Sequence, residues 1–242
     1  MTELLSVKNL HKTYWKTKVL NGIDFTMGHW EVLWYIWPNG AGKTTTIKIL
    51  LWINEPDNGT EIKIDWHTVH NIKKMNVISY LPEKLNLPEY MTWREYIQHI
   101  INLSELQNII TNEDIENKLD LTKFPKISFN KTIKTYSKWM QQRLGLMAVL
   151  LNPNNKLVIL DEPVSWLDPL WQDEMIEIIH TLKKQWKSIF ITTHQMHEVE
   201  ELCDNVIFVK DWKIKDQSNV KDMVKQYWNM IWYYKAIASK EV

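Results

Sequence analysis

The amino-acid sequence predicts an α/β fold with a parallel-sheet core, an antiparallel β edge and an inserted α-helical subdomain. Strand-like apolar runs alternate with helical patterns in both halves of the chain, an order typical of parallel sheets. A glycine-containing loop separates one of these strands from the helix after it. A long helical stretch without strand patterns interrupts the alternation. The 242 residues, 45% of them hydrophobic, suffice for one such domain.

The first two strands are expected over 4–10 and 19–27, joined by a turn at 14–17. The stretch 59–65 alternates with period two and also predicts a strand. Further strands are expected over 31–36, 77–81, 157–160, 188–192 and 206–210, and helices over 43–51, 169–185 and 196–202.

The interrupting segment is helical from Met91 to about Leu151. Its stripe of Tyr96, Ile97, Ile100 and Ile101 has helical spacing, which we interpret as the core face of a helix. We therefore predict one domain over 1–242, with its α/β core in 1–83 and 152–242 and the helical subdomain in about 84–151.

Composition excludes several classes of protein. The net charge is zero and no basic block stands out, so nucleic acid is not expected as a partner. The single cysteine, Cys203, excludes a disulfide framework and fits a reducing compartment. No apolar run is long enough to cross a bilayer, and the N-terminus does not resemble a secretory signal. Any role at a membrane would need another chain.

The loop at 37–45 matches the phosphate-binding pattern G-x-x-x-x-G-K-[ST], except that tryptophan stands at the first glycine. Its backbone N–H groups would surround a triphosphate. Lys43 would reach the β and γ phosphates, and Thr44 would bind Mg²⁺. The predicted nucleotide-binding residues of this loop are Trp37, Pro38, Asn39, Gly40, Ala41, Gly42, Lys43, Thr44 and Thr45.

Two acidic residues end the apolar strand at 157–160. Carboxylates at the C-terminal end of a strand face the crevice where α/β folds bind ligands. Asp161 is a candidate Mg²⁺ ligand, and Glu162 is a candidate general base for an attacking water. An acidic pair after a strand is common by itself, but with a phosphate loop upstream it becomes a specific indication of a nucleotide site.

With these motifs the chain resembles the nucleotide-binding subunit of ATP-binding-cassette (ABC) transporters over nearly its whole length, and thus a P-loop NTPase of the ABC ATPase type. The stretch 136–143 (YSKWMQQR) resembles the signature loop, and 165–168 (SWLD) resembles the D-loop. His194 resembles the switch histidine, and Tyr14 lies where the family places an aromatic ring under adenine.

The resemblance implies ATP and Mg²⁺ as cofactors and a head-to-tail dimer with a second ATPase subunit. Ser137, Trp139 and Asp168 would lie in the composite site, with Ser137 on the γ-phosphate held by the other subunit. His194 would stabilise charge that builds in the transition state. Glu83 departs from the glutamine usual in the Q-loop; it would bind Mg²⁺ or orient water, or else be a surface glutamate in a turn.

The leading hypothesis is an ATPase subunit that powers a membrane transporter, with a preference for export. It would lie in the cytoplasm, peripheral on the inner face of the cell membrane, bound to an integral membrane subunit. One alternative is a soluble ABC ATPase of translation or DNA repair, which would usually carry two cassettes, a long coiled coil or zinc-binding cysteines. Another is a non-hydrolysing nucleotide-binding or scaffold protein.

Tryptophan is abnormally frequent. The chain has 14 Trp and 6 Gly, whereas average usage predicts roughly 17 glycines. The family pattern places glycine at nine of the tryptophans. They are Trp30, Trp34, Trp37, Trp52, Trp66, Trp139, Trp166, Trp186 and Trp212.

Local chemistry supports glycine at three of these sites. Asp65-Trp66 and Asp211-Trp212 stand where Asp-Gly would form a tight hairpin turn with φ > 0. Trp186 follows a helix, where a left-handed glycine often caps the C-terminus. We expect most of the tryptophans to be glycines encoded by UGA, a codon that some bacteria translate as glycine. The alternative is a genuinely tryptophan-rich, decayed ATPase.

Overall fold

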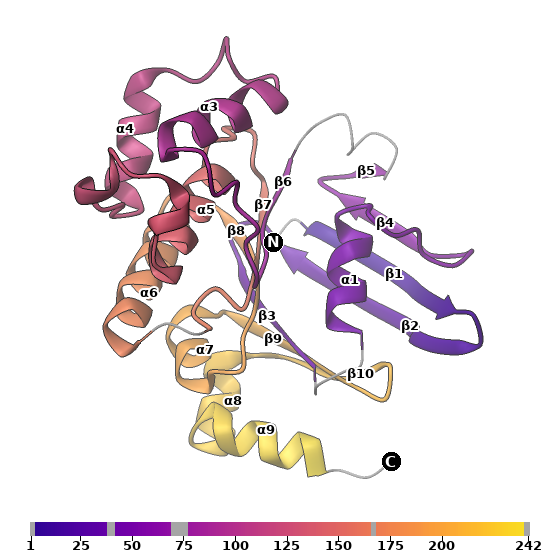
Figure 1. Cartoon of the computed structure of the whole chain (residues 1–242). Coiled ribbons are helices and arrows are strands. Elements are labelled where there is room, and N and C mark those ends of the chain that lie inside the picture. Colours follow the sequence, from indigo (N-terminus) through magenta and orange to yellow (C-terminus); the bar gives the residue numbers. More distant parts are fainter. Residues whose placement is uncertain (1–2, 38–41, 69–76, 166–167, 240–242) are drawn as a thin grey trace.

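The computed structural model describes residues 3–37, 42–68, 77–165 and 168–239 and contains two sheets (Figure 1). The larger sheet has the strand order β10-β9-β3-β8-β7-β6. Its inner strands are parallel, and β10 pairs antiparallel with β9 at one edge. The strands are β3 (Val32–Ile36), β6 (Ile78–Leu81), β7 (Leu157–Asp161), β8 (Ser188–Thr192), β9 (Asn205–Lys210) and β10 (Lys213–Asn219).

Strands β3, β7 and β8 are buried at every position. Their sequences are therefore continuous apolar runs, because elements cover both faces of a parallel sheet. The predicted α/β fold with a parallel core is confirmed.

The smaller sheet is antiparallel, with the order β2-β1-β4-β5. Helix α1 (Lys43–Leu50) lies beside it (Figure 1), and buried α1 residues share one apolar core with both sheets. The strands are β1 (Glu3–Tyr14), β2 (Thr17–Gly28), β4 (Glu61–Ile64) and β5 (His67–Thr68). Strands β1 and β2 extend beyond the predicted ranges because they keep pairing through polar positions up to their turn.

The helical segment contains α3 (Trp93–Leu103), α4 (Asn112–Leu121) and α5 (Lys138–Leu150), with short 3₁₀ turns at Lys126–Ser128 and Ile133–Thr135. Capping boxes built on Thr92 and Thr111 fix where α3 and α4 begin. Ile97 and Ile101 are buried in a core cluster that belongs to this segment alone, with Tyr96 and Ile100 packed against it. The stripe is thus core, as predicted, while the subdomain boundaries remain a prediction.

The C-terminal part adds elements that were not predicted individually. Helices α6 (Pro169–Lys184) and α7 (Met196–Leu202) match the expected ranges closely, but α8 (Val220–Tyr227) and α9 (Met230–Ser239) were missed. Helix α9 is held by fully buried Tyr233, whose hydroxyl donates to Asp216 at 2.6 Å. Such tertiary anchoring leaves no local signal in the sequence.

No helix in the described ranges combines the length and the apolar character that a bilayer crossing needs.

Candidate functional site

The structure brings Lys43 together with Asp161 and Glu162. Lys43 Nζ lies 3.0 Å from Glu162 Oε1 and 3.3 Å from Asp161 Oδ1. Lys43 is the first residue of α1, which follows the phosphate loop, and the two carboxylates stand where β7 ends. Pairing of parallel strands thus carries residues 118 positions apart to one edge of the sheet, as the sequence predicted.

The start of α1 depends on backbone conformation. Gly42 precedes the helix with φ of 116°, a value that side chains rarely permit, and no side chain of the described residues caps the helix. Within this part of the chain, the first N–H groups of α1 therefore remain available for an anion. Thr44 is exposed in this first turn, and Thr45 is half-buried. Pro38, Asn39, Gly40 and Ala41 lie outside the described residues.

Asp161 is held in place by two hydroxyl groups. Thr192 Oγ1 donates to Asp161 Oδ1 at 2.6 Å, and the Tyr80 hydroxyl donates to Oδ2 at 3.4 Å. Burial, then the charge of Asp161, and more weakly that of Glu83, raise the pKa of Tyr80. Tyr80 thus connects the Q-loop strand β6 with Asp161. We did not predict it; a tyrosine within a short apolar strand was the available signal.

Glu162 has three side-chain partners among the described residues. Besides Lys43, His194 Nε2 lies 3.2 Å from Glu162 Oε1, and Ser165 Oγ donates to Oε2 at 3.1 Å. Glu162 has a left-handed φ of 49°, and its N–H donates to the Thr192 carbonyl. The predicted grouping of Glu162 with His194 is therefore present, and Ser165 is a contact that sequence reasoning missed.

The charge on Lys43 is favoured. Burial lowers the pKa of Lys43, but the carboxylates of Asp161 and Glu162 outweigh it and raise the pKa overall. The ammonium group holds together two carboxylates that would otherwise repel. A bound triphosphate would compete with them for this cation.

Trp37 packs against Gly42, which lies in the described part of the loop. Its ring carbons come within 2.7 and 2.9 Å of the position that a Cβ would take at Gly42, and its ring packs on Tyr35 at 6.0 Å. The side chain is 2% exposed, and its indole Nε1 has no hydrogen-bond partner among the described residues. An unpaired buried N–H destabilises a fold by about 1–3 kcal/mol.

The predicted residues of the composite site cap two other helices. Ser137 is the N-cap of α5, and its hydroxyl accepts from Met140 N at 3.4 Å. Trp139, in the first turn of α5, stacks on Trp171 at 4.2 Å. Asp168 is the N-cap of α6 and accepts from Trp171 N at 3.3 Å. Trp166 lies outside the described residues.

Glu83 and Tyr14 are placed differently. Glu83 lines a cleft of about 470 Å³ together with Ser165, Lys138 and Gln142. It thus faces the start of α5 and the segment after Glu162. Tyr14 ends β1 and is partly exposed, and its hydroxyl accepts from Asn54 Nδ2 at 2.5 Å.

Glu198, in α7, is a buried carboxyl group that sequence analysis missed. It has no exposed surface, accepts from Thr193 Oγ1 at 3.2 Å, and its Oε1 has no partner among the described residues. Burial raises its pKa to about 7; nearby Glu162 adds to the shift and the Thr193 bond opposes it.

We expect Glu198→Gln to change how stability depends on pH. Because the folded pKa lies above the unfolded value, the group stabilises the fold below about pH 4.5, and this is lost as pH rises through about 7. The loss amounts to about 3 kcal/mol. Denaturant unfolding from pH 4.5 to 8 should show a shallower fall for Glu198→Gln than for the exposed control Glu201→Gln. Identical profiles would contradict the assignment.

Comparison with known proteins identifies the family. The family model for ABC transporters matches residues 20–165. The chain is 32% identical to the uncharacterized ABC transporter ATP-binding protein YxlF of Bacillus subtilis, covering 92% of this chain and 73% of that protein. It is 32% identical to the lantibiotic transport ATP-binding protein SrtF of Streptococcus pyogenes, covering 96% and 99% respectively.

Among solved structures, a dimeric ATP-binding cassette, MJ0796, in a post-hydrolysis state with ADP and Pi superposes with a TM-score of 0.77. It is 19% identical, and the match covers 89% of this chain and 98% of that one. This likeness supports the fold. Members of the matched family bind ATP and are ATPases. With its phosphate loop, acidic pair and histidine arranged as described, the chain belongs to the ABC transporter family of ATP-binding proteins.

Proposed function

We propose that the chain is the ATP-hydrolysing subunit of a membrane ABC transporter. The observation that carries this proposal is the cluster at the carboxyl end of β7, where Glu162 lies 3.2 Å from His194 and 3.0 Å from Lys43. A carboxylate beside a histidine and a phosphate-loop lysine suits attack of water on a γ-phosphate.

Each residue has a role that its position supports. Lys43 and the backbone of 37–45 bind the phosphates, and Tyr14 stacks under adenine. Thr44, Asp161 and Glu83 offer the hard oxygen ligands that suit Mg²⁺, which neutralises phosphate charge when bound. Glu162 accepts a proton from the attacking water once Lys43 turns to the triphosphate. His194 stabilises the charge that then develops on the γ-phosphate.

The active form in this proposal is a head-to-tail dimer. Ser137 and Asp168 begin helices α5 and α6, and neither is among the hydrogen-bond or ion-pair partners that the described residues give Lys43 and Glu162. They would complete the site of a second copy of the chain. The dimeric assembly named for the superposed cassette is consistent with this arrangement.

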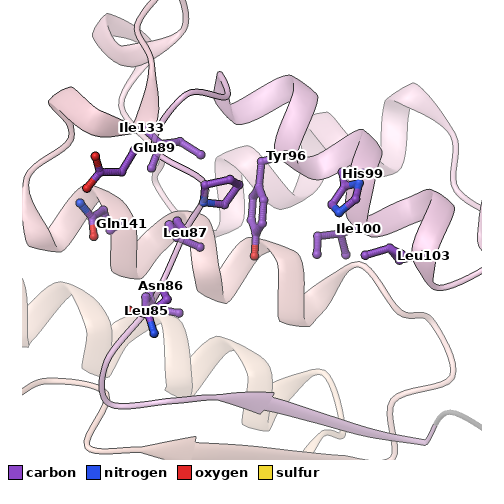
Figure 2. Close-up of a pocket in the computed structure, with 11 residues that line it drawn as sticks. Leu85, Asn86, Leu87, Glu89, Tyr96, His99, Ile100, Leu103, Ile133 and Gln141 are labelled. Carbon is purple, nitrogen blue, oxygen red and sulfur yellow. The ribbon is translucent and has the colours of Figure 1, made fainter.

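A groove next to the Q-loop is our candidate for the membrane partner. Figure 2 shows Leu85, Leu87 and Tyr96 around a cavity of about 490 Å³ between the segment after β6 and helix α3. The cavity shares Leu85 and Gln141 with the cleft that Glu83 lines, so a bound helix could respond to the nucleotide site. We propose an apolar segment of an integral membrane subunit as occupant. The chain would then be cytoplasmic and peripheral on the inner face of the membrane.

Export is the proposed direction of transport. The YSKWM and YLPE stretches resemble those of exporter ATPases, and one relative is named for lantibiotic transport. A soluble ABC ATPase is the alternative. A neighbouring gene for a multi-helix membrane protein would favour the transporter, and its absence the soluble alternative.

We also propose that most tryptophans are glycines in the living organism. Of the 13 non-glycine residues with positive φ in the described structure, seven are tryptophans, a residue for which φ > 0 is strained. Six of these seven are exposed, so burial offsets the strain only in part. The seven left-handed tryptophans are Trp15, Trp30, Trp52, Trp66, Trp186, Trp212 and Trp228.

Hydrogen bonding at these sites matches glycine motifs. Asp65-Trp66 and Asp211-Trp212 join paired strands as two-residue turns with φ > 0 at both positions, the geometry of Asp-Gly. After α6, Trp186 N donates to Lys183 O and Lys187 N to Leu182 O, a Schellman motif with tryptophan at its glycine position. Trp34, Trp37 and Trp139 do not have positive φ, so the proposal of glycine at these three positions depends on the family pattern alone. UGG codons at 37, 139 and 166 would refute the proposal.

The hydrolysis mechanism is tested in a glycine form of the chain, which carries Trp37→Gly, Trp139→Gly and Trp166→Gly. Adding Glu162→Gln should lower ATP turnover about a hundredfold, because the general base is lost. ATP binding should persist, and dimers should accumulate on addition of ATP. Asp173→Asn, at an acidic residue of α6 outside these motifs, is the control. Unchanged turnover in Glu162→Gln would refute the role of Glu162.

A further inference from the structure

Arg143 of α5 connects three helices from a buried position. It is 3% exposed, and its Nη1 donates to the carbonyl oxygens of Thr122 and Lys123, both at 2.7 Å. Its Nη2 forms an ion pair with Glu174 of α6. Thr122 is the C-cap of α4, so the guanidinium satisfies carbonyls that the end of a helix leaves unpaired.

These contacts lie close to both loops that would face a second subunit. Arg143 stands six residues after Ser137, and Glu174 six residues after Asp168. At 1.5 Å per residue, each is about 9 Å along its helix from the loop. The neighbouring Gln142 adds a second link, because its Nε2 donates to the carbonyl of Pro163, immediately after Glu162, at 3.3 Å.

We infer that Arg143 is a positioning residue that holds the signature loop and the D-loop in one fixed arrangement, so that both reach the second subunit together. This inference rests on the proposed function. A buried guanidinium with two carbonyl acceptors and one carboxylate is well suited to this role, because its fork sets direction as well as distance. Lysine offers a single charged centre and would not reproduce the three contacts.

The test uses the glycine form in a Glu162→Gln background, in which ATP-dependent dimers are trapped. Arg143→Lys and Glu174→Gln are compared with Glu177→Gln, which breaks the exposed Lys123–Glu177 pair on the same helix. Four quantities are measured: ATP affinity of the monomer, the ATP-dependent dimer dissociation constant by sedimentation, turnover with Glu162 restored, and the unfolding temperature.

We expect Arg143→Lys and Glu174→Gln each to weaken the dimer about tenfold and to lower turnover up to about a hundredfold, as a misplacement near 1 Å would. Monomer ATP affinity should change less than about twofold. Combining the two substitutions should reduce dimer affinity and turnover no further than the more damaging single substitution does, because each single substitution already breaks the connection between Arg143 and Glu174.

Two results would overturn the inference. The first is that Arg143→Lys and Glu174→Gln remain folded and have the same dimer dissociation constant and the same turnover as the control Glu177→Gln. The other is loss of monomer ATP affinity in parallel with turnover, which indicates general damage to the fold. The proposed function itself would be refuted by a different result. In that case the glycine form with Glu162 intact, supplied with a membrane partner, would bind ATP but neither dimerise nor hydrolyse it.

Discussion

Restoring glycine at positions 37, 139 and 166 should raise ATP turnover about a thousandfold over the sequence as written. In the proposed mechanism, the phosphate loop and the signature loop bring backbone N–H groups close to phosphate. The Trp37 ring packs within 3 Å of the position that a Cβ would take at Gly42, at the described end of the phosphate loop. Trp139 places an indole in the first turn of α5, next to Ser137. Removing the Trp37 and Trp139 side chains should let the phosphate loop and the signature loop approach the nucleotide.

The measurement is steady-state phosphate release by the two chains, together with their ATP affinities. The control carries Trp186→Gly and Trp212→Gly, which relieve backbone strain in turns outside the nucleotide motifs. It should gain stability but little activity. Equal turnover in the written sequence and the glycine form would contradict our account of the motif tryptophans and favour a genuinely tryptophan-rich protein.

Replacing the seven left-handed tryptophans by glycine should raise the free energy of unfolding by about 5 kcal/mol. A side chain in the left-handed region costs roughly 1–2 kcal/mol, and glycine pays about 0.5–1 kcal/mol in lost chain entropy. Trp15 and Trp228 are almost fully exposed and lose little favourable burial, whereas Trp30 and Trp186 lose their ring contact at 5.0 Å, which reduces the gain at those two sites. The sum is comparable with the whole stability of a domain, about 5–15 kcal/mol.

Alanine variants separate strain from loss of the indole. At Trp66 and Trp212, whose φ values are 67° and 63°, glycine should exceed alanine by about 1 kcal/mol, since alanine keeps the Cβ. At Trp232, inside α9, the order should reverse, because alanine favours a helix by about 1 kcal/mol. Denaturant unfolding of the six variants provides the test. Alanine equal to glycine at 66 and 212 would show that strain is absent.

Local sequence patterns determined much of this structure. The apolar runs that became β3, β7 and β8 were predictable because strands buried on both faces carry no polar alternation. The phosphate loop and the acidic pair were predictable because α/β topology places strand ends at one edge. The turns at Asp65-Trp66 and Asp211-Trp212 were identified as φ > 0 sites from two residues each, and the structure has that conformation.

The tertiary structure decided which groups meet across large sequence separations. Tyr80 on Asp161, Ser165 on Glu162 and the links from Arg143 join side chains from different elements. Helix α9 and the buried carboxyl of Glu198 likewise depend on surroundings that no local window contains. The sequence alone therefore determined the family, the phosphate-loop motif and the positions of the left-handed turns at 65–66 and 211–212, because these depend on local spacing and backbone conformation. Only the tertiary structure decided which side chains contact each charged group, since those contacts form when distant segments pack together.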